Sequence, residues 1–163
     1  MEFENTSKTY YLNKLTYVNL RWIAIIGQFI TINSVKFIFE FEFNFILANI
    51  IVFCGAASNL FLIYFFKKSQ LSNRISFNFL VLDIFQLSFL LYLTGGTINP
   101  FSIFLIIPSI FASNSLNLKT NILLIILTII SIIFLAFIHE ELPSPLNEYI
   151  FNKYYYYSLP IAL

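Results

Sequence analysis

Long apolar runs separated by short polar segments make up most of this chain. A membrane-spanning helix needs about 20 mostly apolar residues. The chain has five runs of about that length, at about residues 20–38, 44–66, 75–93, 100–117 and 121–138. The pattern predicts an all-α, polytopic transmembrane helical bundle with five complete spans.

The last residues form a separate aromatic and apolar segment. YYYYSLPIAL, residues 154–163, resembles a tyrosine belt at the membrane interface followed by the first turn of a sixth span. We therefore expect residues 1–163 to form one transmembrane domain that is truncated within its sixth helix. The mixed-charge N-terminus lacks the pattern of a cleaved signal peptide.

Composition supports a membrane protein. Of the 163 residues, 59% are hydrophobic and 10% are charged, whereas a soluble domain carries about 25% charged residues. The net charge of +1 gives no broad basic surface for nucleic acid. The single cysteine, Cys54, excludes an internal disulfide and a multi-cysteine metal site, and we interpret it as a small packing residue.

Basic residues are distributed unevenly between the two sets of loops. One set holds Lys8, Lys14, Arg21, Lys67, Lys68, Arg74 and Lys119, and the other holds Lys36, Lys153, Glu40, Glu42, Glu140, Glu141 and Glu148. The positive-inside rule makes the first set, and with it the N-terminus, cytoplasmic. Arg21 and Trp22 would then be interfacial anchors at the inner end of the first span.

The turn between the third and fourth runs reads TGGTINPF, residues 94–101. Gly95 and Gly96 supply left-handed backbone conformations that end a helix. Asn99 is a good N-cap for the next helix, and Pro100 fits its first position. These residue types explain the segment as a helix hairpin on the outer membrane side, and they leave open whether the hairpin also binds a ligand.

The same residues have the chemistry of a ligand site. Amides that follow Pro100 are expected to be unpaired at the positive end of the helix dipole. Gly95 and Gly96 would let a flat ring approach the backbone, and Phe101 offers a face for stacking. A quinone headgroup suits these features. The glycines lack the strand and lysine of a phosphate-binding loop, and nothing here favours a metal.

The stretch DIFQLSFLLYLTGGTINPFSIFLIIPSIFASNSLN extends this motif over residues 83–117. It resembles the membrane domain of the RegB/PrrB/ActS family of redox-responsive sensor histidine kinases. The matching positions are Asp83, Gln86, Leu87, Leu90, Leu91, Leu93, Thr94, Gly95, Gly96, Asn99, Pro100, Phe101 and Pro108. LRWIAIIGQ at 20–28 and HEELPSPL at 139–146 are similar to further segments of that family.

The resemblance implies a redox- and quinone-sensing input domain of a two-component sensor kinase in the bacterial inner (cytoplasmic) membrane. It implies that Gly95, Gly96, Asn99, Pro100 and Phe101 contact ubiquinone or a related quinone, with the Asn99 amide on a quinone carbonyl. The homodimer interface, the ATP-dependent kinase activity and the cognate response regulator would belong to a kinase core beyond residue 163. This chain has no phosphoacceptor segment and no ATP-binding motif, so we expect no catalytic residues in it.

Asp83 is an ionisable residue near the middle of the third run. An intramembrane carboxylate is costly, so we expect it to face the bundle, with Gln86 on the same helical face. The pair could be a proton-coupled element, or a hydrogen-bonded clasp between helices with Asp83 neutral, and we favour the clasp. Pro108 is expected to kink the fourth helix.

Two other classes of function fit the sequence less well than the sensor. A small polytopic transporter or channel subunit would place an ionisable group and a broken helix near mid-bilayer, as Asp83 and Pro108 do in part. The absence of an internal repeat in the sequence weighs against it. A membrane enzyme would need paired carboxylates or a histidine cluster at one depth, and the sequence shows neither pattern.

Overall fold

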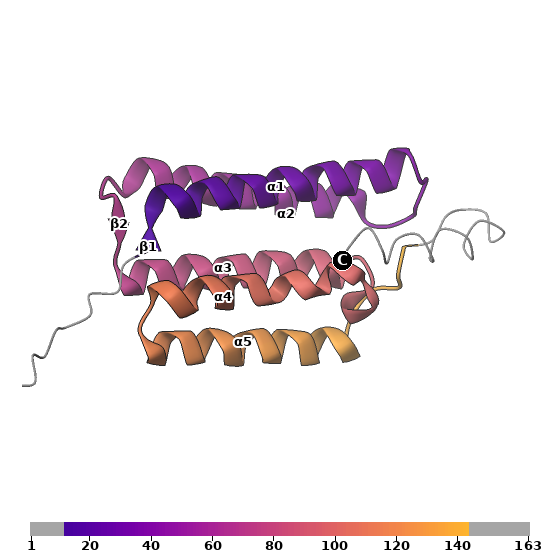
Figure 1. Ribbon diagram of the computed structural model, residues 1–163. Coiled ribbons are helices and arrows are strands. Elements are labelled where there is room, and N and C mark those ends of the chain that lie inside the picture. Colours follow the sequence, from indigo (N-terminus) through magenta and orange to yellow (C-terminus); the bar gives the residue numbers. More distant parts are fainter. Residues whose placement is uncertain (1–11, 144–163) are drawn as a thin grey trace, which may run out of the picture.

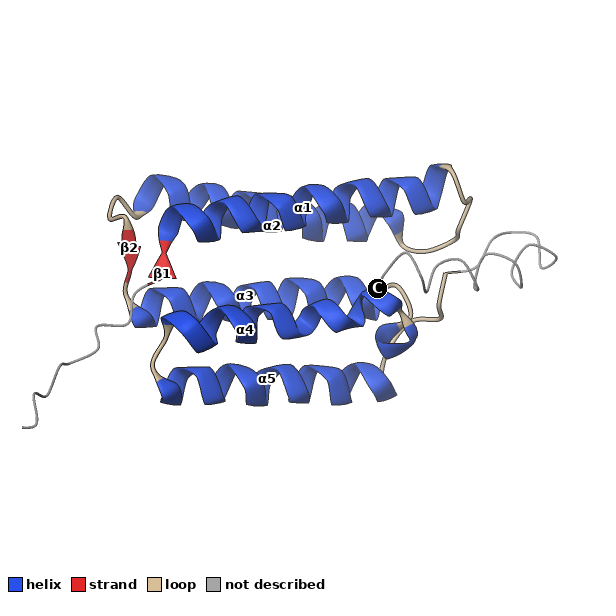
Figure 2. Cartoon of the chain, viewed as in Figure 1, coloured by secondary structure: helices blue, strands red, loops and turns tan. Residues whose placement is uncertain are grey.

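The computed structural model of this protein describes residues 12–143. Its helices are α1 (Lys14–Phe37), α2 (Phe45–Phe65), α3 (Asn73–Tyr92), α4 (Ile107–Ser115) and α5 (Leu118–Phe137). Two 3-10 helices, η1 (Gly96–Ile98) and η2 (Pro100–Ile106), connect α3 to α4. The short strands β1 (Leu12–Asn13) and β2 (Gln70–Leu71) pair antiparallel at one end of the bundle (Figure 2).

The long helices run side by side along one common direction (Figure 1). Helices α1 and α2 form one hairpin, and α3, α4 and α5 form a second group. Helix α2 packs closely against α3, whereas α1 reaches α3 through long side chains. The predicted all-α architecture is confirmed.

Four of the described helices, α1, α2, α3 and α5, are long and apolar enough to cross a membrane. Large apolar side chains are exposed along them; Phe137, for example, is 83% exposed and Ile46 72%. An apolar surface of this extent suits contact with lipid. The fourth expected span is a shorter apolar helix, Pro100–Ser113. Five complete spans are therefore not confirmed, and the expected sixth lies outside the described residues.

Pro108 explains why the fourth segment is not one regular α-helix. Proline has no N–H, and its ring clashes with the carbonyl four residues earlier, here that of Phe104. The Phe104 carbonyl instead accepts a hydrogen bond from the Ile107 N–H, which winds the preceding turns as a 3-10 helix. Pro108 then sits in the first turn of α4. The expected kink inside a helix is thus a junction between two helix types.

Helix α1 begins earlier than its apolar run. The Asn13 side chain caps it by accepting hydrogen bonds from the N–H groups of Leu15 and Thr16 at 3.0 and 3.3 Å. Lys14 Nζ donates hydrogen bonds to the carbonyls of Ile63 and Phe66 at the end of α2. The distance from Nζ to the Ile63 carbonyl oxygen is 2.9 Å. As a result, the residues near position 21 lie inside the helix and not at its inner boundary.

Candidate ligand-binding cavity

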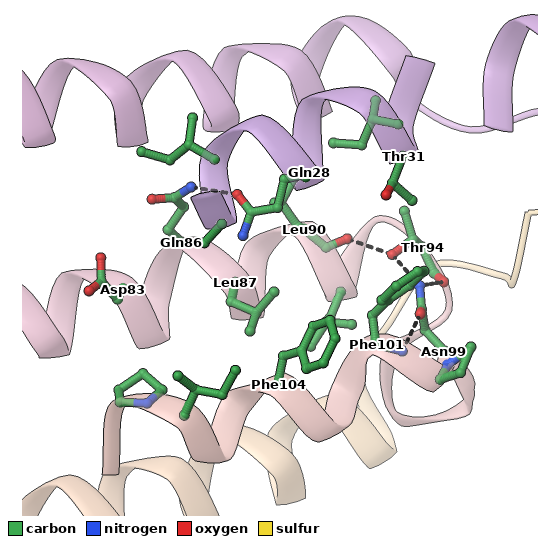
Figure 3. Close-up of a pocket in the computed structure, with 18 of the residues that line it drawn as sticks. Gln28, Thr31, Asp83, Gln86, Leu87, Leu90, Thr94, Asn99, Phe101 and Phe104 are labelled. Atoms are coloured by element: carbon green, nitrogen blue, oxygen red, sulfur yellow. Dashed lines mark hydrogen bonds between the residues drawn. The ribbon is translucent and has the colours of Figure 1, made fainter. Parts of the chain in front are cut away.

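A cavity of about 610 Å³ lies between α1 on one side and α3, η2 and α4 on the other. Its walls are mostly apolar, with Leu87, Leu90, Phe101 and Phe104 among the lining side chains (Figure 3). Its polar lining side chains include Tyr17, Arg21, Gln28, Thr31, Asp83, Gln86, Thr94 and Asn99. A size of about 300–1,000 Å³ and apolar walls with a few polar groups are typical of small-molecule sites.

The turn at residues 94–101, at one end of this cavity, has the predicted backbone geometry. Gly95 and Gly96 adopt positive φ angles of 100° and 59°. The Asn99 side chain caps η2 by accepting a hydrogen bond from the Phe101 N–H at 2.9 Å, and Pro100 occupies the first helical position. The interpretation of the motif as a helix stop followed by a helix start is confirmed.

The two glycines of this turn pack against other parts of the chain. A Cβ atom on Gly96 would lie 2.5 Å from the Leu135 carbonyl oxygen and 2.7 Å from the His139 ring. On Gly95 it would lie 2.5 Å from the Leu142 side chain. The space beside both glycines is therefore filled by the protein, and it is not open to a flat ring as the sequence led us to expect.

The side-chain amide and the backbone carbonyl of Asn99 are both used within the turn. Its Nδ2 donates to the Thr94 carbonyl at 2.9 Å and to Thr94 Oγ1 at 2.8 Å. Its backbone carbonyl accepts from the Ser102 N–H at 2.9 Å. With the Phe101 N–H also bound to its side chain, the expectation of unpaired amides directly after Pro100 is wrong. Asn99, Pro100 and Phe101 nevertheless line the cavity.

Arg21 lies in a buried polar cluster at the other end of the cavity. Its side chain is 5% exposed. Its Nε donates to Asp83 Oδ1 at 2.8 Å, its Nη2 to Ser58 Oγ at 2.6 Å and its Nη1 to Asn59 Oδ1 at 3.4 Å. Tyr17 donates its hydroxyl to the other oxygen of Asp83. We call these five residues the Arg21 cluster.

This cluster corrects one expectation and confirms another in part. Arg21 does not extend to the membrane interface, because it is buried among α1, α2 and α3. Trp22 is partly buried and packs against both apolar cores. Asp83 does clasp helices together, as favoured, but it does so in an ion pair with Arg21 and not as an isolated neutral carboxyl. Intramembrane charges usually pair with one another, and that rule could have indicated this partner.

A second polar bridge between α1 and α3 lies nearer the middle of the cavity. Gln86 Nε2 donates to Gln28 Oε1 at 2.9 Å (Figure 3). The Gln86 amide packs over Gly55 of α2, so closely that a Cβ atom there would collide with it. Sequence reasoning singled out Gln86 but not Gln28, although an amide within an apolar run facing another amide is a typical helix-bridging signal.

The remaining candidate groups lie apart from the cavity. The Cys54 thiol is exposed on α2, so its interpretation as a packing residue is wrong. His139 bonds through Nδ1 to the Glu140 carbonyl oxygen at 2.8 Å. Within residues 12–143, no group of three or more His, Cys, Asp or Glu side chains is arranged to hold a metal ion.

Comparison with known proteins shows one informative similarity. The chain is 29% identical over 128 residues to the sensor histidine kinase RegB of Cereibacter sphaeroides. The aligned part is 78% of this chain but 28% of RegB, so the chain spans little more than a quarter of that relative. No protein-family model and no solved structure matches the chain. The similarity and the four apolar helices together indicate a membrane sensor domain.

Proposed function

We propose that this chain is the membrane input domain of a sensor histidine kinase of the RegB/PrrB/ActS family, and that its signal is a quinone bound in the cavity. The observation that carries the proposal is the cavity itself, which a motif of that family borders at Asn99, Pro100 and Phe101. The similarity to RegB supports the kinase connection. Gly95 and Gly96 contribute to the site by shaping the turn.

The lining of the cavity suits a lipid-soluble flat ring. Phe101 and Phe104 present adjacent rings, with centroids 5.8 Å apart. Leucine side chains of α3 cover a facing wall, and the polar groups are few and spaced apart. A quinone ring would stack on the phenylalanines while its tail extends toward lipid.

The domain arrangement proposed for the full protein follows the same resemblance. Segment 100–117 makes a fifth crossing, because it lies alongside both α3 and α5 and joins their opposite ends. A sixth helix leads to a cytoplasmic kinase core that dimerises, uses ATP and passes phosphate to a response regulator. Quinone occupancy between the α1–α2 hairpin and the α3–α5 group biases how the two groups pack, and this bias is the signal.

A transporter or channel subunit is the less favourable alternative. Such a protein needs an ionisable group that is free to bind its cargo or a proton. Asp83 is instead held by Arg21 and Tyr17. This arrangement serves helix packing better than transport.

The proposal is tested by quinone titration of the full chain in lipid nanodiscs, followed through the fluorescence of its one tryptophan, Trp22. Removal of the stacking face in Phe101→Ala is expected to weaken binding about tenfold. Phe89→Ala is the matched control, because Phe89 lies on α3 but is 59% exposed and does not line the cavity. Absence of saturable binding by the parent chain would overturn the proposed function.

A further inference from the structure

The amide of Gln28 has hydrogen-bonding capacity that the protein does not use. Its Oε1 accepts from Gln86 at 2.9 Å. Its Nε2, which carries two N–H donors, has no hydrogen-bond acceptor among the described residues, and it lies on the cavity wall (Figure 3). If the O and N of both amides are exchanged, Gln28 donates one N–H to Gln86 and keeps its second N–H without an acceptor, so a free donor remains on Gln28 in either assignment.

Thr31 provides a second unused donor on the same wall. It lies three residues beyond Gln28, about 4.5 Å along the axis of α1, and therefore on the same helical face. Its hydroxyl makes no hydrogen bond with any of residues 12–143, and its side chain lines the cavity. The hydroxyl of Thr94, in contrast, donates to the Leu90 carbonyl at 2.8 Å and accepts from Asn99.

The distribution of free donors thus differs between the two sides of the cavity. At the turn, Asn99, Thr94 and the N–H groups of Phe101 and Ser102 are paired with one another. On α1, Gln28 and Thr31 are not. Unpaired polar groups in an apolar environment are costly, so they bind an acceptor strongly when one is supplied.

We propose that Gln28 and Thr31 are the polar recognition residues of the site and that they donate hydrogen bonds to a ring carbonyl oxygen of the ligand. The inference rests on the proposed function and specifies which residues recognise the quinone. The ring stacks on Phe101 and Phe104 from the η2 side while its oxygen meets α1. The motif at the turn then supplies shape and stacking, and α1 supplies the hydrogen bonds.

This geometry also connects the ligand to the packing of the bundle. Gln28 already bridges α1 to α3 through Gln86. A ligand held by Gln28 on one side and by Phe101 on the other joins the two helix groups across the cavity. Ligand and Gln86 share one amide, so occupancy of the site acts directly on the contact between α1 and α3.

The test compares Gln28→Leu with the parent chain in nanodiscs, using a short-tail benzoquinone as the probe. Loss of the donor is expected to raise the dissociation constant about tenfold, and Thr31→Val is expected to act in the same direction. The infrared carbonyl stretch of the bound probe should shift toward that of free quinone in both variants, because a hydrogen bond to the carbonyl is lost. An alkylbenzene without oxygen should bind the parent and both variants equally.

Asn33→Leu is the matched control for these variants. Asn33 is also a bridging amide on α1, since it donates to the Phe29 carbonyl at 2.7 Å and to Asn49 of α2 at 3.4 Å. It does not line the cavity, so quinone affinity should not change. Thermal unfolding of each variant checks that it is folded. Thr31→Val keeps the test informative if Gln28→Leu does not fold, because the Thr31 hydroxyl makes no hydrogen bond with any described residue.

The outcomes separate this inference from the proposed function. In one outcome the parent chain binds quinone and Phe101→Ala weakens this binding, but Gln28→Leu and Thr31→Val change neither the affinity nor the carbonyl frequency. This result overturns the role of α1 and keeps the quinone site. Absence of parent binding overturns both proposals. A loss of affinity in Asn33→Leu equal to that in Gln28→Leu assigns the effect to helix packing and also overturns the role of α1.

Discussion

Arg21 shows how a single charged residue can organise one half of this bundle. Its guanidinium group bonds to Asp83 of α3 and Ser58 of α2, and it lies 5.5 Å from the centre of the Phe79 ring. Burial of a charge is tolerated only when it is paired and hydrogen-bonded. The surrounding groups meet that condition, so the Arg21 cluster fixes the relative positions of three helices.

Replacement of one member of this ion pair should be far more damaging than replacement of both. Arg21→Leu leaves the partly buried Asp83 without its charged partner, and we expect a loss of up to about 3–5 kcal/mol in unfolding free energy. The double variant Arg21→Leu with Asp83→Leu should recover most of that loss. Both are measured by denaturing-detergent titration followed by circular dichroism.

Arg74→Leu is the matched control for the ion-pair experiment, because Arg74 is exposed near the start of α3 and has no hydrogen-bond partner among the described residues. Its unfolding free energy should stay within about 0.5 kcal/mol of the parent value. Equal losses in the single and double variants would show that Arg21 contributes through packing and not through its charge.

At the scale of helices, sequence pattern predicted some elements well and others poorly. The apolar runs at 44–66, 75–93 and 121–138 correspond closely to α2, α3 and α5. The apolar pattern places the start of α1 at about residue 20, later than its observed start at Lys14. The reason is that Lys14 and Arg21 interrupt the apolar pattern, although they bond to α2 and α3. Such long-range side-chain partners are not visible in a single sequence. The cavity and its free donors were unforeseen for the same reason.

In the turn between α3 and η2, too, the local structure follows from the sequence and the long-range contacts do not. Its caps follow from residue type, so Gly95, Gly96 and Asn99 were assigned their local roles correctly. What surrounds those residues depends on where α5 ends. Leu135 and His139 approach from α5 and the segment after it, and they turn a presumed ligand surface into a packing contact.

Gly96→Ala is predicted to destabilise this junction. The new Cβ would collide with the Leu135 carbonyl, and alanine disfavours the φ of 59° found there. We expect a loss of about 1–3 kcal/mol in unfolding free energy. Gly27→Ala is the control, since nothing lies within 4 Å of its Cβ position and alanine favours a helix interior by about 1 kcal/mol. Equal stability of the two variants would contradict the packing described here.

At the scale of the whole molecule, charge is divided between the two ends of the bundle. One end carries Lys14, Lys67, Lys68, Arg74 and Lys119, and the other carries Lys36, Glu40, Glu42, Glu140 and Glu141. With Arg21 moved into the interior, the basic end still outnumbers the opposite end in lysine and arginine. The asymmetry favours a cytoplasmic location for the end that holds β1 and β2.

Cysteine labelling of intact cells tests this orientation. In a Cys54→Ser background, Glu42→Cys should react with a membrane-impermeant thiol reagent, because it is exposed in the loop between α1 and α2. Ser69→Cys, exposed in the loop after α2, should react only after the cells are permeabilised. The reverse pattern would place the end of the cavity near Asn99 on the cytoplasmic side and would contradict the proposed topology.

The pairing of β1 with β2 has a mechanical consequence for the bundle. Leu12 pairs with Leu71, the Lys14 N–H donates to the Ser69 carbonyl at 3.0 Å, and the Lys14 ammonium holds the end of α2. Together these contacts fix the start of α1 to the end of α2 and to the segment before α3. If α1 separates from α3, we expect the displacement to be smallest at these contacts and to grow with distance from them. We therefore expect the largest displacement of α1 at its opposite end, beside Asn99 and Phe101.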